Sequence, residues 1–166
     1  VVSLSVGIVK RVIVKYTGYV EAGRKEDDIA VKKHILSEVE KGRNYLKNIL
    51  EIAHKNKDMD GTRATKRVLD ELDIFSNEVD LSEEGHRYGF FSVHKGTSLH
   101  QIAKLIDHDK ALIESMANVT EAGKRLEDAM LDKETLDLPK ELGKMRQYVT
   151  TARNQYRDRI EHIKKI

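Results

Sequence analysis

The segment from Pro139 to Ile166 holds the most regular pattern in this sequence. Behind Pro139, the only proline, apolar residues recur at steps of three and four, and they are Leu142, Met145, Val149, Ala152, Tyr156, Ile160 and Ile163. This spacing puts them all on one face of a long amphipathic helix. The same rhythm returns in most other segments. The sequence therefore predicts an all-α chain, a four- or five-helix bundle of long, mostly antiparallel helices.

Composition agrees with that fold class. Of the 166 residues, 39% are hydrophobic and 35% are charged, a balance that suits solvated helices and argues against a β-sandwich with many turns. The length fits a single domain, 1–166, that buries its core without disulfides or a structural metal. The absence of cysteine excludes thiol catalysis and cysteine-ligated metals, and it predicts a reducing, cytoplasmic location.

The helix boundaries follow from turn and capping residues. We expect a first helix over 2–20, with a strand pair as its alternative, and a second helix capped by Asp27 and Asp28. A turn at 57–62 precedes the third helix, and Thr97 or Ser98 caps the fourth. The predicted inner faces of the second and third helices are Ile35, Val39, Leu46, Ile49, Ala53, Ala64, Val68, Leu72, Phe75 and Val79.

Residues 82–97 lack helical periodicity and form the longest irregular connection. Connections of this length are often binding loops or lids. The alternative is a spacer across the end of the bundle, in which aromatic side chains plug the core. The candidate site residues of this connection are His86, Arg87, Tyr88, Phe90, Phe91 and His94.

The N-terminal segment is the one region with an uneven charge. The whole chain carries a net charge of only +2 with interleaved signs, so its charge does not predict a nucleic-acid partner. Residues 1–25, in contrast, place several basic residues against Glu21 alone. This amphipathic segment either joins the bundle, pairs with another chain, or lies on an anionic membrane surface through residues 1–24. Its candidate contact residues are Val2, Val6, Val9, Lys10, Arg11, Ile13 and Lys15.

A metal site is one alternative function. Glu51 and His54 have the Glu-x-x-His spacing of di-iron bundles, and that spacing puts both side chains on one helix face. The pair lies off the predicted core stripe, and the second match, Glu83 with His86, falls in the glycine-containing connection. Apart from this metal alternative, no cofactor is predicted.

A ribonuclease is another alternative. Arg157 and His162 form an Arg-x4-His pair, which resembles the motif of HEPN-type ribonucleases, a family of helical bundles. The resemblance covers six residues. It implies that Arg157 would stabilise the charge of the scissile phosphate and that His162 would serve in acid–base chemistry.

The sequence favours a non-enzymatic function over these two enzymatic alternatives. It contains no phosphate-binding glycine loop, dinucleotide fingerprint or nucleophile elbow. Helices of about 30 residues carry longer apolar stripes than helices need in order to pack into a compact bundle of short helices. We therefore predict an interaction or scaffold module that self-associates in the manner of a coiled coil. A regulatory or sensor bundle with a ligand site in the 82–97 connection is the remaining alternative.

Overall fold

The computed structural model describes residues 2–92 and 96–166, and for residues 2, 3 and 83–85 it describes the backbone alone. The described residues are 85% helical and include no strand. The α-helices are α1 (Val2–Val12), α2 (Arg24–Lys55), α3 (Met59–Leu81), α4 (Leu99–Leu131) and α5 (Leu138–Lys165). The predicted all-α bundle is confirmed.

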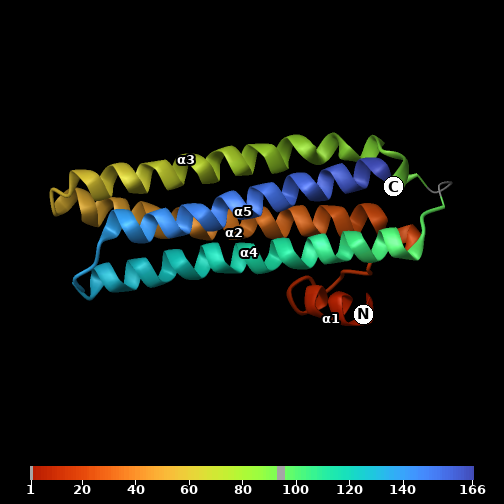
Figure 1. The fold of residues 1–166 in the computed structure, drawn as a ribbon, viewed down its shortest axis with the longest axis horizontal. Helices are drawn as coiled ribbons and strands as arrows, with labels where there is room; N and C mark the ends of the chain where they lie inside the picture. The colour runs from red at the N-terminus through yellow and green to blue at the C-terminus, as the bar shows by residue number, and fades with distance from the viewer. Residues whose placement is uncertain (1, 93–95) are drawn as a thin grey trace.

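The helices α2 to α5 lie side by side along the long axis of the molecule (Figure 1). Helices that follow each other, α2 with α3 and α4 with α5, are antiparallel and joined by short turns, as predicted. The other packed pairs, α2 with α4 and α3 with α5, run in the same direction. The connection after α3 therefore crosses one end of the bundle to reach the diagonally placed α4.

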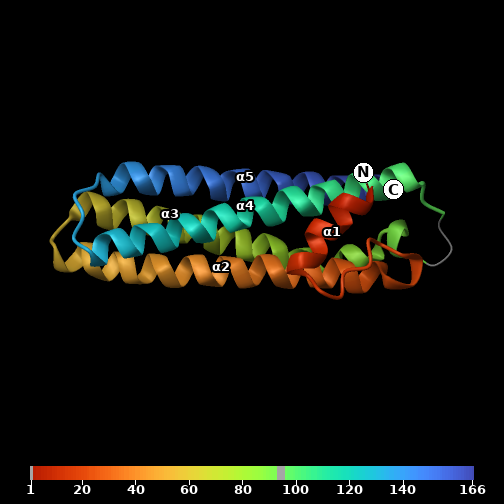
Figure 2. The same cartoon turned by 90° about the horizontal axis from the view of Figure 1, so that it is seen from below.

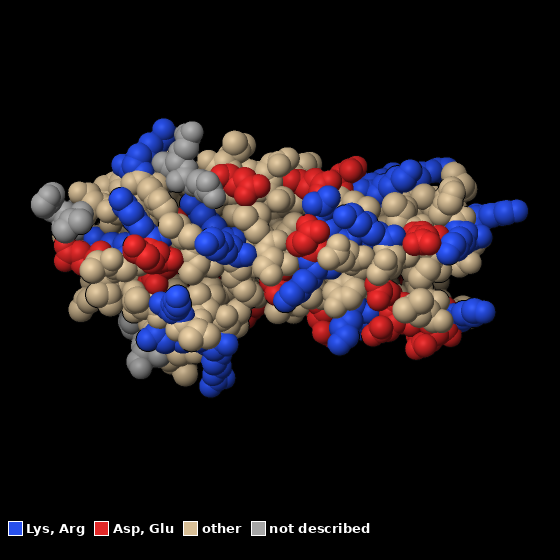
Figure 3. All heavy atoms as spheres, turned by 180° about the vertical axis from the view of Figure 1, so that it is seen from behind, with Lys and Arg blue, Asp and Glu red and all other residues tan. Residues whose placement is uncertain are grey.

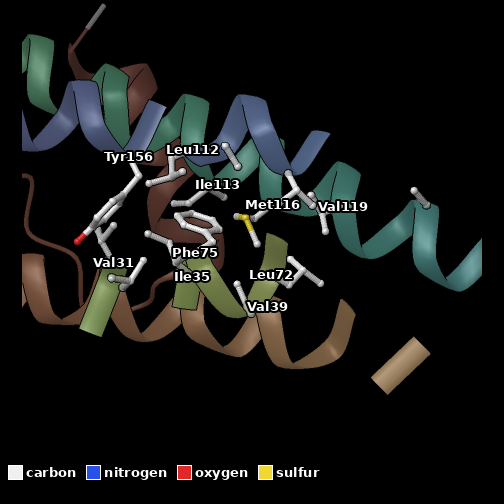
Figure 4. Packing of buried hydrophobic residues seen from close by; sticks show 14 of the residues in the cluster. Val31, Ile35, Val39, Leu72, Phe75, Leu112, Ile113, Met116, Val119 and Tyr156 are labelled. Atoms are coloured by element: carbon white, nitrogen blue, oxygen red, sulfur yellow. The ribbon is translucent and has the colours of Figure 1, made fainter. Parts of the chain in front are cut away.

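One continuous cluster of buried apolar side chains fills the space between the four helices. In Figure 4, Phe75 of α3 lies among Ile35 of α2, Met116 of α4 and Tyr156 of α5, and its ring meets that of Tyr156 edge to face. All the residues predicted for the inner faces of α2 and α3 are buried except Ala64, which is half-buried. The helical periodicity of the sequence therefore predicts this part of the core correctly.

Local capping explains where the later helices begin. The Ser98 side chain accepts a hydrogen bond from the Gln101 backbone amide, and the Gln101 side chain accepts one from the Ser98 amide. This capping box satisfies two amides that the first turn of α4 leaves unpaired. Asp137 caps α5 ahead of Pro139, which lies in the first turn, where its missing N–H costs nothing.

The N-terminal part of the chain differs from the prediction. α1 ends at Val12, and residues 13–23 continue as irregular chain and a short 3₁₀ turn, η1 (Glu21–Gly23). Gly18 and Tyr19 both adopt left-handed backbone conformations, with φ of 79° and 62°, which a right-handed helix over 2–20 does not allow. Residues 2–23, which we call the N-terminal strap, lie across the side of the bundle with α1 against α4 (Figure 2).

The prediction that Asp27 and Asp28 cap the second helix is also wrong. α2 begins earlier, at Arg24, and both aspartates are buried within its first two turns. Their carboxylates are directed instead at other parts of the chain, as described below.

The connection after α3 is more regular than its sequence suggests. It forms two 3₁₀ turns, η2 (Ser82–Arg87) and η3 (Gly89–Phe91). Phe90 and Phe91 are buried, with ring centroids 5.1 Å apart, whereas Tyr88 is half-buried. The two phenylalanines therefore occupy the end of the bundle as a plug. His94 lies outside the described residues.

Candidate functional site

Charged side chains are buried beneath the strap, at core positions of three bundle helices. Arg159 of α5 and Asp109 of α4 are both 0% exposed, and Asp28 of α2 is 1% exposed. The Nε atom of Arg159 donates to Oδ1 of Asp109 at 2.6 Å, and its Nη1 atom lies 2.8 Å from Oδ1 of Asp28. One guanidinium thus links three helices at one level of the bundle.

The strap reaches the same group of side chains through two tyrosines. The Tyr16 and Tyr19 hydroxyls donate to Oδ2 of Asp109 at 2.8 and 2.5 Å. Nη2 of Arg159 donates to the Tyr19 hydroxyl at 2.8 Å. We call Asp28, Asp109, Arg159, Tyr16 and Tyr19 the buried charge cluster. Because two of its members belong to the strap, the cluster binds the strap to the bundle.

Asp28 connects the cluster to the far end of α3. Its Oδ2 atom lies 2.9 Å from Nζ of Lys32 and 2.9 Å from Nε2 of His86. Lys32 also donates to the backbone carbonyl of Ser82 at 2.8 Å. His86, a predicted site residue of the connection, is therefore placed against a buried carboxylate, and this contact fixes the start of the connection.

Burial and the neighbouring charges shift the pKa values of the cluster members in different directions. Burial opposes ionisation of Asp28, but the charges of Arg159 and Lys32 outweigh it, so the pKa of this carboxyl is lowered. Burial raises the pKa of Asp109, against the attraction of Arg159 and the hydrogen bonds that it accepts. Burial works against the charge of Arg159 too, yet Tyr19 and the two carboxylates hold its pKa well above the ordinary value. The cluster is thus a buried ion pair network.

The two tyrosines remain hydrogen-bond donors in this setting. Burial, together with the nearby Asp109 carboxylate, raises the pKa of Tyr16, and burial raises that of Tyr19 although Arg159 opposes the rise. Neither phenol loses its proton near neutral pH. Each of the four carboxylate oxygens of Asp28 and Asp109 lies within 2.9 Å of a cationic nitrogen or a tyrosine hydroxyl. The arrangement therefore leaves no carboxylate oxygen open to a substrate, and it holds the strap against the bundle.

A second contact fixes the turn that precedes α2. The carboxylate of Asp27 accepts hydrogen bonds from the Thr17 amide at 2.8 Å, the Thr17 hydroxyl at 2.7 Å and the Tyr19 amide at 2.7 Å. These bonds hold the left-handed residues in place. Adjacent aspartates thus have separate roles, Asp27 in shaping the turn and Asp28 in the charge cluster.

The predicted contact residues of the strap divide into two groups. Val9 and Ile13 are buried against this chain's own bundle, and Val6 is half-buried. The side chain of Val2 lies outside what the structure describes. The basic residues of the prediction are all exposed, and they are Lys10, Arg11 and Lys15. Among the predicted contact residues whose side chains the structure describes, the basic ones are therefore the most available to a partner while the strap is docked.

The structure does not bring the two predicted catalytic residues together. Arg157 lies 2.6 Å from the carboxylate of Glu78 in α3. His162 hydrogen-bonds through Nε2 to the carbonyl oxygen of Gln101 in α4 at 2.8 Å, and its ring centroid lies 5.4 Å from that of His108. The two side chains contact different neighbouring helices, so this geometry does not favour the ribonuclease alternative.

No third ligand joins the predicted metal pair within the described part of the chain. Glu51 forms an ion pair with Lys55 at 3.1 Å, one turn along α2. In the part of the chain that the structure describes, no three His, Asp or Glu side chains are grouped so that they could hold a metal ion. The Glu51 and His54 pair gains no support from this geometry.

Comparison with protein-family models, with curated proteins and with solved structures found no match to this chain. None of the helices in the described residues has the length and apolar character needed to cross a membrane.

Proposed function

We propose that this protein is a non-enzymatic interaction module, which presents the outward face of its N-terminal strap to a partner. That face consists of exposed residues on and just after α1, and they are Leu4, Gly7, Lys10, Arg11, Val14 and Lys15. The observation that carries the proposal is the contrast between this exposed apolar and basic face and the tightly bonded inner face of the same segment.

The outward face retains large apolar side chains that the fold does not bury. Leu4 is 70% exposed and Val14 is 85% exposed. On the opposite side of the strap, Val9 and Tyr16 are buried. An exposed apolar side chain adds little to folding, so Leu4 and Val14 are available for contact with a partner.

Docking gives the binding surface a fixed shape. Burial of Val9, Ile13 and the two tyrosines stabilises the docked strap by roughly 1.5–3 kcal/mol for each large apolar side chain. The hydrogen bonds to Asp109 and Asp27 then set its orientation. A surface that is ordered before binding loses less conformational entropy when the partner arrives.

Self-association, which the sequence predicts, is one form that this interaction can take. A second copy of the chain would then be the partner of the outward face. Light scattering on a sizing column measures the solution mass and tests this prediction directly.

Thermal unfolding tests the proposal itself. Substituting Leu4→Gln and Val14→Gln should leave the melting temperature nearly unchanged, because exposed substitutions usually change stability by less than about 0.5 kcal/mol. The matched variant Val9→Ala removes two buried methyl groups and should cost about 2 kcal/mol, which lowers the melting temperature by roughly 4–8 °C. If the Leu4 and Val14 variants lose as much stability as Val9→Ala, these side chains support the fold and the proposal fails.

A further inference from the structure

The part of the strap that precedes Glu21 carries charge of one sign. The first acidic residue of the chain is Glu21, so the segment before it carries basic side chains and no carboxylates. Figure 3 shows basic side chains gathered on the protruding part at the lower left, with uncharged side chains between them. Asp107 of α4, which touches α1, accepts a hydrogen bond from Ser5 on the inner side at 2.9 Å. The outward face therefore suits an anionic partner.

The placement of side chains along α1 adds an apolar component to that charge. Leu4 and Arg11 are seven residues apart, so they lie two turns apart on the same side of the helix, and Gly7 lies between them. Val9 and Ser5, which are buried, lie on the opposite side. Val14 and Lys15, which follow the end of α1, are also exposed. Apolar and basic groups are thus available together.

The shape of this region favours a flat partner. The strap stands out from the side of the bundle beyond α4 (Figure 1). A partner helix binds most strongly in an apolar groove, whereas an anionic lipid surface can take up the exposed basic side chains of a protruding helix in its headgroup layer while the apolar stripe of α1 stays packed on the bundle. Basic side chains contact anionic headgroups, and short apolar side chains enter between the acyl chains.

We infer that the outward face of the strap binds reversibly to an anionic lipid surface. This inference rests on the proposed function and names the partner of the same face. Each basic residue near such a surface contributes roughly five-fold in affinity, so Lys10, Arg11 and Lys15 together contribute about a hundred-fold. Binding is therefore peripheral and sensitive to salt.

Vesicle flotation of the full chain tests this inference. The protein should float with vesicles that contain phosphatidylserine and phosphatidylcholine, and it should not float with phosphatidylcholine alone. The variant Lys10→Gln/Arg11→Gln/Lys15→Gln should bind about a hundred-fold more weakly. The variant Leu4→Gln/Val14→Gln should also bind more weakly, because it removes the apolar contacts. Added salt should weaken the binding of the unmodified chain.

A matched control separates the strap from general charge. Lys47, Lys66 and Lys124 are exposed on the bundle helices, and replacing all three with Gln changes the net charge by the same amount. This control should float like the unmodified chain. Equal loss of binding in the control and the strap variant would overturn the inference, since the strap would then have no special role.

The remaining outcomes distinguish this inference from the proposed function. If the unmodified chain does not float with either kind of vesicle, the lipid partner is excluded. If light scattering then finds an oligomer that Leu4→Gln/Val14→Gln dissociates, a second copy is the partner, and the proposed function stands without the lipid inference. The melting temperatures of the face variants test the proposed function independently of both results.

Discussion

Replacement of Arg159 by Met should be among the most damaging single substitutions in this chain. The guanidinium is fully buried and contacts carboxylates on two other helices. Methionine fills much of the same volume but carries no charge. Asp28 would keep Lys32 and His86 as partners, whereas Asp109 would keep only the tyrosine hydroxyls. The uncompensated charge therefore falls mainly on Asp109.

The size of the loss follows from the cost of an unpaired buried charge. Removing one partner of a buried ion pair typically costs about 3–5 kcal/mol. For a chain of this length, 1 kcal/mol corresponds to roughly 2–4 °C in melting temperature, so the expected fall is on the order of 10 °C. Adding Asp109→Asn to the variant should recover a large part of the loss, because it removes the stranded charge.

The pH dependence of this variant carries a definite sign. Burial already raises the pKa of Asp109, and loss of Arg159 raises it further. A carboxyl whose folded-state pKa lies above its unfolded value stabilises the fold at low pH and loses that contribution as the pH rises through the folded pKa. The stability difference between Arg159→Met and the unmodified chain should therefore narrow as the pH is lowered from neutral toward the pKa of Asp109.

Urea unfolding monitored by circular dichroism measures these differences. Arg157→Met is the matched control, since Arg157 lies two residues away on the same helix with its side chain 55% exposed. An exposed ion pair contributes about 0.2–1 kcal/mol, so the control should lose no more than that. An Arg159→Met variant that loses as little as the control would refute the view that the cluster holds the strap and the bundle together.

Two further predictions concern the strap and the histidines. Gly18→Ala should lower the free energy of unfolding by about 1–2 kcal/mol, because φ is 79° there and the added Cβ would lie 3.0 Å from Cγ2 of Val6. Gly7→Ala should instead raise it by roughly 0.5–1 kcal/mol, because the space around Gly7 in α1 is open. Thermal melts in which Gly7→Ala is the less stable variant would contradict this description of the backbone. Burial and then the nearby His162 lower the pKa of His108. The contribution of neutral His108 to stability should therefore be fully present above its ordinary pKa of 6.5 and be lost as the pH falls through the lowered pKa. This loss should be smaller in His108→Gln, and an unfolding free energy with the same pH dependence in that variant would exclude the effect.

Much of the bundle was predictable because helical periodicity marks buried faces. The stripes on the second, third and fifth predicted helices all correspond to buried or half-buried residues in α2, α3 and α5. The cap at Ser98 and the first-turn position of Pro139 were equally predictable, since each depends on local chemistry within one turn.

The strap and the cluster were harder to predict because they depend on contacts between distant segments. Tyr16 lies within the predicted first helix, 2–20, but the reversal at Gly18 and Tyr19 requires Asp27, which the sequence predicts as a helix cap. One signal was present. Asp109 falls on the apolar stripe of its helix between Leu105 and Leu112.

The same signal occurs on α5. Arg159 lies between Tyr156 and Ile163 on that apolar stripe. A basic and an acidic residue at core positions of two separate helices indicate a buried ion pair, since neither charge is stable alone in a core. Arg157, the residue that the sequence predicts as part of a ribonuclease motif, lies two positions before Arg159 and is largely exposed.

Amide hydrogen exchange at Thr17 and Tyr19 tests the central claim most directly. Both amides donate to the carboxylate of the buried Asp27, and Tyr19 is itself buried in the charge cluster. If the strap is docked as described, these two amides should exchange nearly as slowly as those in the middle of α2. Exchange at the rate of an unfolded peptide, while the amides of α2 stay protected, would show that the strap is not held to the bundle and would contradict the account.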